Sequence, residues 1–239
     1  MRVLVSLLAF ASALPLLAAE PWKLDDAFKA AKPDDLKDAD TTPPPKGAVV
    51  LFDGKNTDAW VKQDGKTPIK WTLRDGVMEG VKGHGNIITK EKFGGKFKLH
   101  VEFRVPYEPE NKGQGRGNSG VYVQGRYEVQ ILDSYGLKSK NNDAGAIYEV
   151  AAPKVNACKA PTVWQAYDIE FTAPKFENGK KTEPARMTVH HNGIKIHDDV
   201  PIPSDNTRAG MGGDPAAPGP IMLQDHGHPV QFRNVWLTR

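Results

Sequence analysis

Apolar and polar residues alternate strictly in several short segments of this chain. From Phe97 to Val105, apolar residues occupy every second position, with Lys, His, Glu and Arg between them. Successive side chains of a β-strand point to opposite faces, so this period of two predicts a half-buried strand. Shorter apolar or alternating runs predict further strands in residues 49–52, 71–79, 118–134, 164–172, 187–194 and 220–239.

Turn residues separate these segments at short intervals. Asn192-Gly193 lies between two alternating arms, which is a strong signal for a type I′ hairpin, and Asp75-Gly76 predicts a second hairpin. The 239 residues include 23 Gly and 19 Pro, and no helical period of ten residues lies between the strands. We therefore predict an all-β fold, an antiparallel β-sandwich, in one main domain.

The first 46 residues differ from the rest. Residues 1–19 contain one early Arg, an apolar run and small residues at Ala18 and Ala19, which is typical of a secretory signal peptide and too short and Ala-rich for a membrane span. Residues 20–46 are predicted to be a leader or linker that lies against the domain, with a short helix near residues 25–31 and an extended backbone at Pro43 to Pro45. Residues 47–239 then form the domain, and the mature protein is expected to be secreted or periplasmic.

Charge and cysteine content exclude several classes. The formal charge of +3 is near balance, so nothing indicates a nucleic-acid partner. Cys158 is the single cysteine, which excludes an intramolecular disulfide, and its position excludes a lipid anchor near the signal cleavage site. We expect Cys158 to be a small buried residue rather than a nucleophile.

The segment 118–134 carries the densest set of candidate groups. Alternation places Tyr127, Val129 and Ile131 on one face and Glu128 and Gln130 on the other. A regular strand sends Asp133 to the apolar face, and a β-bulge, which is common at active sites, would bring it to the side of Glu128. The polar face is therefore either merely solvated or a ligand site.

The spacing E-x-Q-x-x-D in this segment resembles the E-x-D-x-x-E signature of retaining β-glucanases built on concanavalin-like sandwiches. Retaining cleavage requires two carboxyl groups about 5 to 5.5 Å apart. Here the middle acid is replaced by the amide Gln130, which argues against that mechanism.

A wider resemblance runs from about Val49 to the C-terminus. It rests on five segments in order: GNSGVYVQGRYEVQILDSYG, GAIYEVAAPKVNAC, WQAYDIEFTAPKF, PARMTVHHNGIKIHDD and GPIMLQDHGHPVQFRNVWL. These segments resemble the 3-keto-disaccharide hydrolase family, formerly a domain of unknown function. The resemblance implies a jelly-roll β-sandwich of the concanavalin-like lectin and glucanase type, and action on glycosides that are already oxidised at sugar carbon 3.

The implied chemistry is coherent. A ketone at C3 acidifies the proton on C2, so a carboxylate or an imidazole can remove it, and the C1 oxygen substituent then leaves by elimination. Addition of water completes a net hydrolysis. Such a site needs a base, a donor or cation for the enolate oxygen, and an acid for the leaving group.

Polar residues of the matching segments are assigned to these roles. We expect Glu128 and His226 to be base and acid, and Arg233 or Arg126 to be the oxyanion partner. Asp133, grouped with the catalytic residues, and Gln130 are expected to position them. The remaining expected sugar contacts are Asn118, Tyr122, Gln124, Arg126, Trp164 and Gln224.

Each assignment has a structural alternative. Glu128 is alternatively a solvated strand residue in a salt bridge, residues 225–228 a simple turn, and Trp164 and Tyr122 core aromatics. In the last strand, alternation places either Arg233 or Asn234 inward, where it would be a buried structural residue.

No cofactor is expected, although a divalent metal is left open. Candidate ligands without a recognised spacing are His190, His191, His197, Asp198, Asp225 and His226. The expected function is cleavage of 3-keto-glycosides or 3-keto-disaccharides by an exported enzyme. The alternatives are a non-catalytic carbohydrate-binding sandwich and a conventional retaining glycoside hydrolase. Carbohydrate is the expected partner, and nothing in the pattern indicates an oligomeric state.

Overall fold

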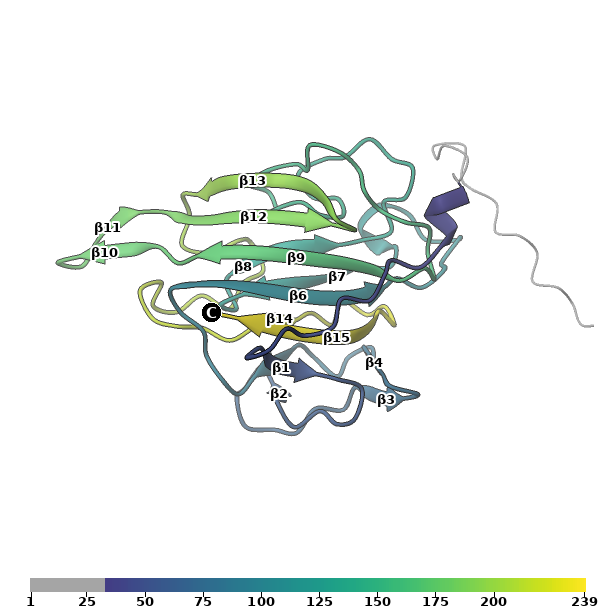
Figure 1. The fold of residues 1–239 in the computed structure, drawn as a ribbon, viewed down its shortest axis with the longest axis horizontal. Helices are drawn as coiled ribbons and strands as arrows, with labels where there is room; N and C mark the ends of the chain where they lie inside the picture. Colours follow the sequence, from purple (N-terminus) through teal and green to yellow (C-terminus); the bar gives the residue numbers. More distant parts are fainter. Residues whose placement is uncertain (1–32) are drawn as a thin grey trace, which may run out of the picture.

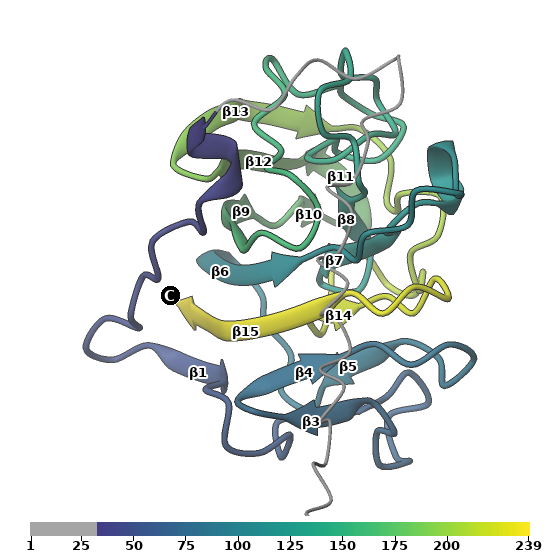
Figure 2. The same ribbon diagram turned by 90° about the vertical axis from the view of Figure 1, so that its right-hand side faces the viewer.

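Two antiparallel β-sheets pack face to face in this protein (Figure 1, Figure 2). The computed structural model describes residues 33–239. The large sheet has the order β13-β12-β9-β6-β15-β4-β3, with β1 paired to β15, and the small sheet has the order β2-β5-β14-β7-β8. The strands of the large sheet are β1 (Val49–Phe52), β3 (Thr72–Arg74), β4 (Val77–Glu79), β6 (Lys96–Arg104), β9 (Gln165–Thr172), β12 (Ala185–His191), β13 (Ile194–Ile202) and β15 (Gln231–Thr238). The strands of the small sheet are β2 (Trp60–Lys62), β5 (Ile87–Thr89), β7 (Ser119–Val123), β8 (Tyr127–Ile131) and β14 (Met222–Leu223).

Three short features complete the described chain. The hairpin of β10 (Lys175–Glu177) and β11 (Lys180–Glu183) projects beyond the end of the large sheet in Figure 1. Two 3₁₀ turns, η1 (Pro33–Leu36) and η2 (Gly113–Gly115), lie outside the sheets. None of the helices in residues 33–239 is long and apolar enough to cross a membrane.

The core lies between the two sheets. β6 contributes its alternate residues from Phe97 to Phe103, and β8 contributes Tyr127, Val129 and Ile131. These are the apolar faces that the period of two predicted, because every second side chain of a strand points to the same side. The predicted all-β antiparallel sandwich is confirmed.

Both predicted hairpin turns are also present. Asn192 and Gly193 have φ angles of 52° and 77° between β12 and β13, and Asp75 and Gly76 have 52° and 75° between β3 and β4. A type I′ turn needs positive φ at both central residues, which Asn, Asp and Gly tolerate best. Local sequence therefore sets the register of these two hairpins.

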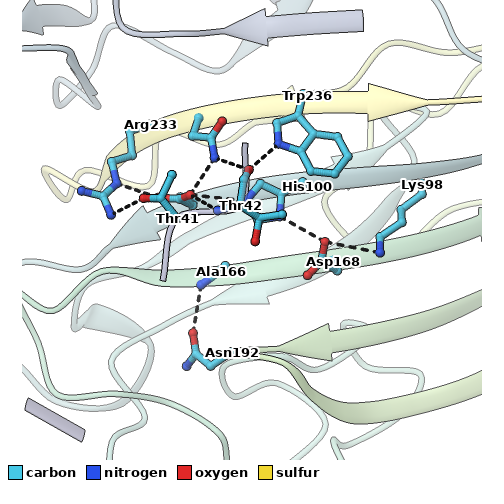
Figure 3. A network of polar contacts seen from close by, with 11 residues as sticks. Thr41, Thr42, Lys98, His100, Ala166, Asp168, Asn192, Arg233 and Trp236 are labelled. Atoms are coloured by element: carbon cyan, nitrogen blue, oxygen red, sulfur yellow. Dashed lines mark hydrogen bonds and ion pairs between the residues drawn. The ribbon is translucent and has the colours of Figure 1, made fainter. Parts of the chain in front are cut away.

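The described part of the leader, residues 33–46, lies across the outer face of the large sheet. The backbone N–H of Ala39 donates to the carbonyl of Trp164 at 2.9 Å, and that of Trp164 donates to Asp38 Oδ1 at 2.9 Å. The Trp236 indole donates to the Thr42 carbonyl at 3.0 Å (Figure 3). The leader is thus held against the domain by specific hydrogen bonds. The predicted signal peptide and the predicted helix near residues 25–31 lie outside the described residues.

Beneath the leader lies a buried polar network centred on Glu102 of β6. Figure 3 shows Thr41, His100 and Arg233 of this network. Its carboxylate is 1% exposed and accepts hydrogen bonds from Arg233 Nε at 2.6 Å and Asn234 Nδ2 at 2.7 Å. Burial opposes ionisation, but hydrogen bonds from His100, Asn234 and Arg233 lower the pKa of Glu102 to about 2. His100 also contacts Asp168, at 3.1 Å. Burial lowers the pKa of His100, but hydrogen bonds to Asp168 and Glu102 outweigh burial, so the pKa of His100 is raised.

The expectation that Arg233 or Asn234 points inward is wrong. The pairing of β15 with β6 shifts register between Arg233 and Trp236, and Asn234 has a φ of 44°. This β-bulge places both side chains on the outer face, where both bond to Glu102. Alternation is restored after the bulge, since Val235 lies in the core.

Candidate active site

Glu128 lies at the centre of a group of polar residues on the small sheet. The register of β7 and β8 pairs Glu128 with Tyr122 and Gln130 with Gly120. Because Val129 and Ile131 fill the core, the side chains of Glu128 and Gln130 point to the opposite, outer face of the small sheet. The two-faced strand predicted from the sequence is present.

This polar face is covered rather than solvated. The side chains of Glu128, Gln130 and Tyr122 are 2%, 1% and 0% exposed. The Glu128 N–H donates to the Thr207 hydroxyl at 3.1 Å, and the Glu128 carbonyl accepts from the N–H of Tyr148 at 3.1 Å. The alternative of a solvated, salt-bridged strand residue is therefore wrong for Glu128.

The chain following β8 explains part of this cover. In the segment that follows β8, the Ala146 carbonyl accepts the N–H of Gln130 at 2.9 Å, and the Gly145 N–H donates to the Gln130 carbonyl at 2.9 Å. The free edge of β8 is paired in this way, which satisfies its backbone and protects an edge strand.

Burial controls the protonation of Glu128. It raises the pKa of this carboxyl to about 7, although a hydrogen bond with Tyr122 opposes the shift, and the nearby Glu149 adds to it. Burial and the adjacent Glu128 charge raise the pKa of the Tyr122 phenol above its ordinary value of 10. Gln224 Nε2 donates to the Tyr122 hydroxyl at 3.0 Å. A carboxyl that titrates near neutral pH is well matched to general acid–base chemistry.

Gly120 makes room for the Glu128 carboxyl. A Cβ built on Gly120 would lie 2.4 Å from Glu128 Oε1 and 2.8 Å from Tyr122 Cε2. Any residue with a Cβ at position 120 would displace the Glu128 carboxyl. This steric limit explains why the residue paired with Gln130 is a glycine.

A catalytic role for Glu128 predicts that Gly120→Ala reduces kcat/KM by roughly 10²-fold, because displacing a catalytic group by about 1 Å has effects of that size. Gly115→Ala is the matched control, since a Cβ there meets no atom within 4 Å. Steady-state kinetics and thermal melts of both variants provide the test. Equal activity of the two variants would show that the placement of Glu128 over Gly120 is unimportant.

His226 lies at the end of β14 in an exposed turn. Asp225 accepts the N–H of Gly227 through Oδ1 at 2.9 Å and that of Gly85 through Oδ2 at 2.8 Å, which are turn-forming contacts. The rings of His226 and His228 stack at 6.0 Å. Because Gln224 contacts Tyr122 and this turn follows directly, the turn lies at the same end of the small sheet as Gly120.

Sequence reasoning missed the pair of His228 and Glu108. His228 Nδ1 lies 2.7 Å from Glu108 Oε2, and the same oxygen accepts the N–H of Gly117 at 2.8 Å. A carboxylate partner fixes the orientation of an imidazole ring. Since 120 residues separate the two side chains, no local signal could have paired them.

Gln124 and Arg126 hold a loop in place. Arg126 donates to the carbonyls of Asp214 at 3.0 Å and Ala217 at 2.6 Å, and to Gln124 Oε1 at 2.9 Å. Gln124 Nε2 donates to the carbonyl of Phe93 at 2.9 Å. Both side chains are thus bonded to protein groups next to the β7–β8 turn, and the guanidinium is engaged by carbonyl oxygens.

Asp133 lies beyond the end of β8. The pairing of β7 with β8 is regular from Tyr127 to Ile131, so no β-bulge lies within the paired part of β8, which ends before Asp133. Asp133 Oδ2 lies 2.7 Å from Arg116 Nε, and Asp133 Oδ1 accepts the N–H of Tyr135. Its pKa is nevertheless raised, because burial outweighs the charge of Arg116.

Arg233 and Trp164 are separated from Glu128 by the sandwich. They lie on the outer face of the large sheet, where the guanidinium carbons of Arg233 and Arg104 are 4.2 and 4.7 Å from the centre of the Trp164 ring. Arg233 is bound to Glu102. The structure therefore does not bring Arg233 or Trp164, both assigned to the sugar site from the sequence, next to Glu128.

The histidines considered as metal ligands are dispersed. His191 Nε2 lies 2.9 Å from Gln165 Oε1, and burial lowers the His191 pKa to about 3, whereas His197 Nε2 contacts the Gly145 carbonyl at 2.8 Å. Within residues 33–239, no three His, Cys, Asp or Glu side chains form a group that could hold a metal ion.

A cavity of about 1030 Å³ lies elsewhere, between the leader and the edge of the large sheet. Its lining includes Asp38, Lys159, Asp168 and Asn192 but none of the residues around Glu128. The cavity and the Glu128 group are therefore distinct features.

The two packed antiparallel sheets define a β-sandwich of the concanavalin-like type. Residues 47–238 match the model of the 3-keto-alpha-glucoside-1,2-lyase-like domain, so the chain belongs to this family. This is the family that the sequence segments resembled.

Solved structures agree with this assignment. A crystal structure of a candidate glycosyl hydrolase from Parabacteroides distasonis is 37% identical, covers 82% of this chain and 84% of its own, and has a TM-score of 0.73. A second candidate glycosyl hydrolase from the same organism is 21% identical with a TM-score of 0.58, covering 81% and 94%, and shows the shared fold. None of the functionally curated proteins matches.

Proposed function

We propose that this protein cleaves 3-keto-glycosides, with Glu128 as the base. The observation that carries the proposal is a buried carboxyl, poised near neutral pH, within a domain of the 3-keto-alpha-glucoside-1,2-lyase-like family. Its environment gives Glu128 the basicity that removal of a proton next to a ketone requires.

The proposed reaction begins with transfer of the C2 proton to Glu128. The electrons of the C2–H bond move into an enolate whose oxygen is the former C3 ketone. The enolate then re-forms the ketone and a C1–C2 double bond, while the C1–O bond breaks and the leaving oxygen takes a proton. Addition of water across the double bond would make the net reaction a hydrolysis.

His226 or His228 is proposed as the acid that protonates the leaving oxygen. His226 is exposed, and His228 is held by Glu108 at the same end of the small sheet. Neither Arg126 nor Arg233 can stabilise the enolate oxygen in this arrangement. Arg126 donates to backbone carbonyls, and Arg233 lies on the large sheet.

A conventional retaining mechanism is disfavoured by the same geometry. Retaining enzymes need a second carboxyl about 5 to 5.5 Å from the first. The neighbour of Glu128 on this face of β8 is the amide Gln130, and Asp133 is bound to Arg116 beyond the strand. The nearby carboxyl of Glu149 is paired with Arg208.

Release of 4-nitrophenol from the 3-keto-glucoside, and not from the unoxidised glucoside, is the expected result. In D₂O, the product should carry deuterium at C2, because hydration of the C1–C2 double bond adds solvent deuterium there. Recovered keto substrate should also carry deuterium at C2 if the enolate forms reversibly. Equal cleavage of both glucosides would indicate a conventional hydrolase. Binding without release from either would indicate a non-catalytic carbohydrate-binding protein.

Export of the enzyme also stands as a proposal, based on residues 1–19. The intact mass of the protein recovered outside the cytoplasm would show whether these residues are removed.

A further inference from the structure

Three side-chain amides surround Gly120 on the polar face of the small sheet. Gln130 is paired with Gly120 across β7 and β8, and Asn118 precedes Gly120 by two residues. The backbone N–H of Gln224 donates to the Gly120 carbonyl at 3.1 Å. We call Asn118, Gln130 and Gln224 the amide cluster.

Each amide of the cluster is held through its nitrogen. Asn118 Nδ2 donates to the Gln114 carbonyl at 2.7 Å, and Gln130 Nε2 donates to Gln114 Oε1 at 3.0 Å. Gln224 Nε2 donates to the Tyr122 hydroxyl at 3.0 Å. Gln114 is itself oriented, because its Nε2 donates to the Asn142 carbonyl at 2.7 Å.

These contacts fix which end of each amide is free. Turning Asn118 or Gln130 over would set one carbonyl oxygen against another, which is unfavourable. Tyr122 is hydrogen-bonded to Glu128, and an ionised carboxylate can only accept, so the Tyr122 oxygen is left to accept from Gln224. The nitrogen of each amide is therefore its anchored end.

The three oxygens of the cluster have no partner. Asn118 Oδ1, Gln130 Oε1 and Gln224 Oε1 are buried atoms without a hydrogen bond, and the side chains of Asn118 and Gln130 are only 2% and 1% exposed. Buried acceptors are almost always satisfied, because leaving one unpaired forfeits its hydration. Three such oxygens next to one catalytic candidate indicate a ligand that supplies the missing donors.

We propose that the amide cluster accepts hydrogen bonds from hydroxyl groups of the sugar, and so selects neutral glycosides with free ring hydroxyls. This inference rests on the proposed function of the Glu128 site. A carbonyl oxygen only accepts, so it recognises a hydroxyl but repels a carboxylate oxygen. Glu128 and the nearby Glu149 strengthen this discrimination against anionic sugars such as uronides.

Cations also bind amide oxygens, but the donor set favours hydroxyls. A divalent cation usually takes several carboxylate ligands with its carbonyl ligands. In the described residues, Glu128 is the only carboxylate among the residues that face Gly120 from β7, β8 and Gln224. A bound cation is therefore the competing outcome of the experiment.

The test pairs substrate analogues with enzyme variants. The substrates are 4-nitrophenyl 3-keto-glucoside, its 4-deoxyfluoro and 6-deoxyfluoro analogues, in which fluorine cannot donate, and the corresponding 3-keto-glucuronide. The variants are Gln130→Met and Gln224→Met, which remove the acceptor and keep a similar shape. Gln231→Met is the matched control, because Gln231 bonds to Glu79 and Arg104 on the large sheet. Thermal melts identify any variant that is not folded.

Wild-type enzyme is expected to lose roughly 10- to 100-fold in kcat/KM on at least one fluoro analogue and on the glucuronide. Gln130→Met or Gln224→Met should lower kcat/KM on the parent substrate by a similar factor. Replacing the parent substrate with that analogue should then lower kcat/KM of the variant little further. Gln231→Met should behave as wild type. The proposal would be overturned if wild-type enzyme had full activity on every analogue. It would also be overturned if, in every cluster variant, the loss caused by the analogue and the loss caused by the substitution multiplied. Loss of activity in EDTA that calcium restores would overturn it in favour of a cation.

Failure of the proposed function would look different. If wild-type protein does not cleave the keto substrate, the amide cluster can still be tested through binding. The ligand is unoxidised methyl glucoside, and its affinity is measured by calorimetry or saturation-transfer NMR. Binding that the cluster variants weaken by 10-fold or more and Gln231→Met leaves unchanged would support hydroxyl recognition without catalysis. Equal binding by all four proteins would overturn it.

Discussion

Glu128→Gln is expected to reduce kcat/KM on a 3-keto-glycoside by roughly 10²- to 10⁴-fold, the range that general base catalysis contributes. The amide keeps the shape that fits over Gly120 but cannot take the C2 proton. Glu170→Gln, at an exposed position of β9, is the matched control. Turnover within threefold of wild type would remove Glu128 from the mechanism.

The pH dependence follows from the environment of the same carboxyl. Because burial raises the pKa of Glu128 to about 7, the activity of wild-type enzyme should fall as the pH drops through this value. If the profile instead falls near pH 4.5, Glu128 is not the titrating base.

The same shift predicts a stability effect of known sign. The Glu128 pKa is higher in the folded protein than the ordinary value of 4.5, so the folded state binds more protons between these values. Its contribution to stability is complete below pH 4.5 and is lost as the pH rises through about 7. Relative to Glu128→Gln, wild-type protein should therefore lose roughly 2 to 3 kcal/mol of unfolding free energy between pH 4.5 and 8. Denaturant titrations of both proteins across this range measure the difference.

Glu102→Ala is expected to lower the free energy of unfolding by about 3 kcal/mol or more at pH 7. The change leaves the Arg233 guanidinium and the Asn234 amide without their buried acceptor and removes the contact to Thr41 of the leader. Denaturant titration measures the loss, and proteolysis within residues 33–46 should become faster.

Activity separates this variant from Glu128→Gln. Glu102 lies on the outer face of the large sheet, so the folded Glu102→Ala protein should retain kcat/KM, whereas a catalytic role for Arg233 would make it inactive. The effect should also diminish in acid. Because the Glu102 pKa is lowered to about 2 in the fold, its contribution is present above pH 4.5 and is lost as the pH falls toward 2. A loss below about 1 kcal/mol at pH 7 would class the network with ordinary surface ion pairs.

Local sequence determined the strands and their faces. The alternation in β6 and β8 has a period of two, which only an extended chain converts into one apolar face, so the core residues of both strands could be read directly. The positive φ angles of Asn192 and Gly193 likewise follow from residue type. The same logic placed Glu128 and Gln130 together on the polar face.

Tertiary structure decided what surrounds that face. The contact of Gln224 with Tyr122 spans 102 residues and that of Arg233 with Glu102 spans 131, so no local pattern could assign one to the Glu128 site and the other to the opposite sheet. Strict alternation also failed at Asn234, where a single left-handed residue turned the side chain outward. Sequence periodicity fixes which side of its own strand a residue occupies, whereas its neighbours, burial and pKa depend on strands that are distant in the chain and meet only in the folded sandwich.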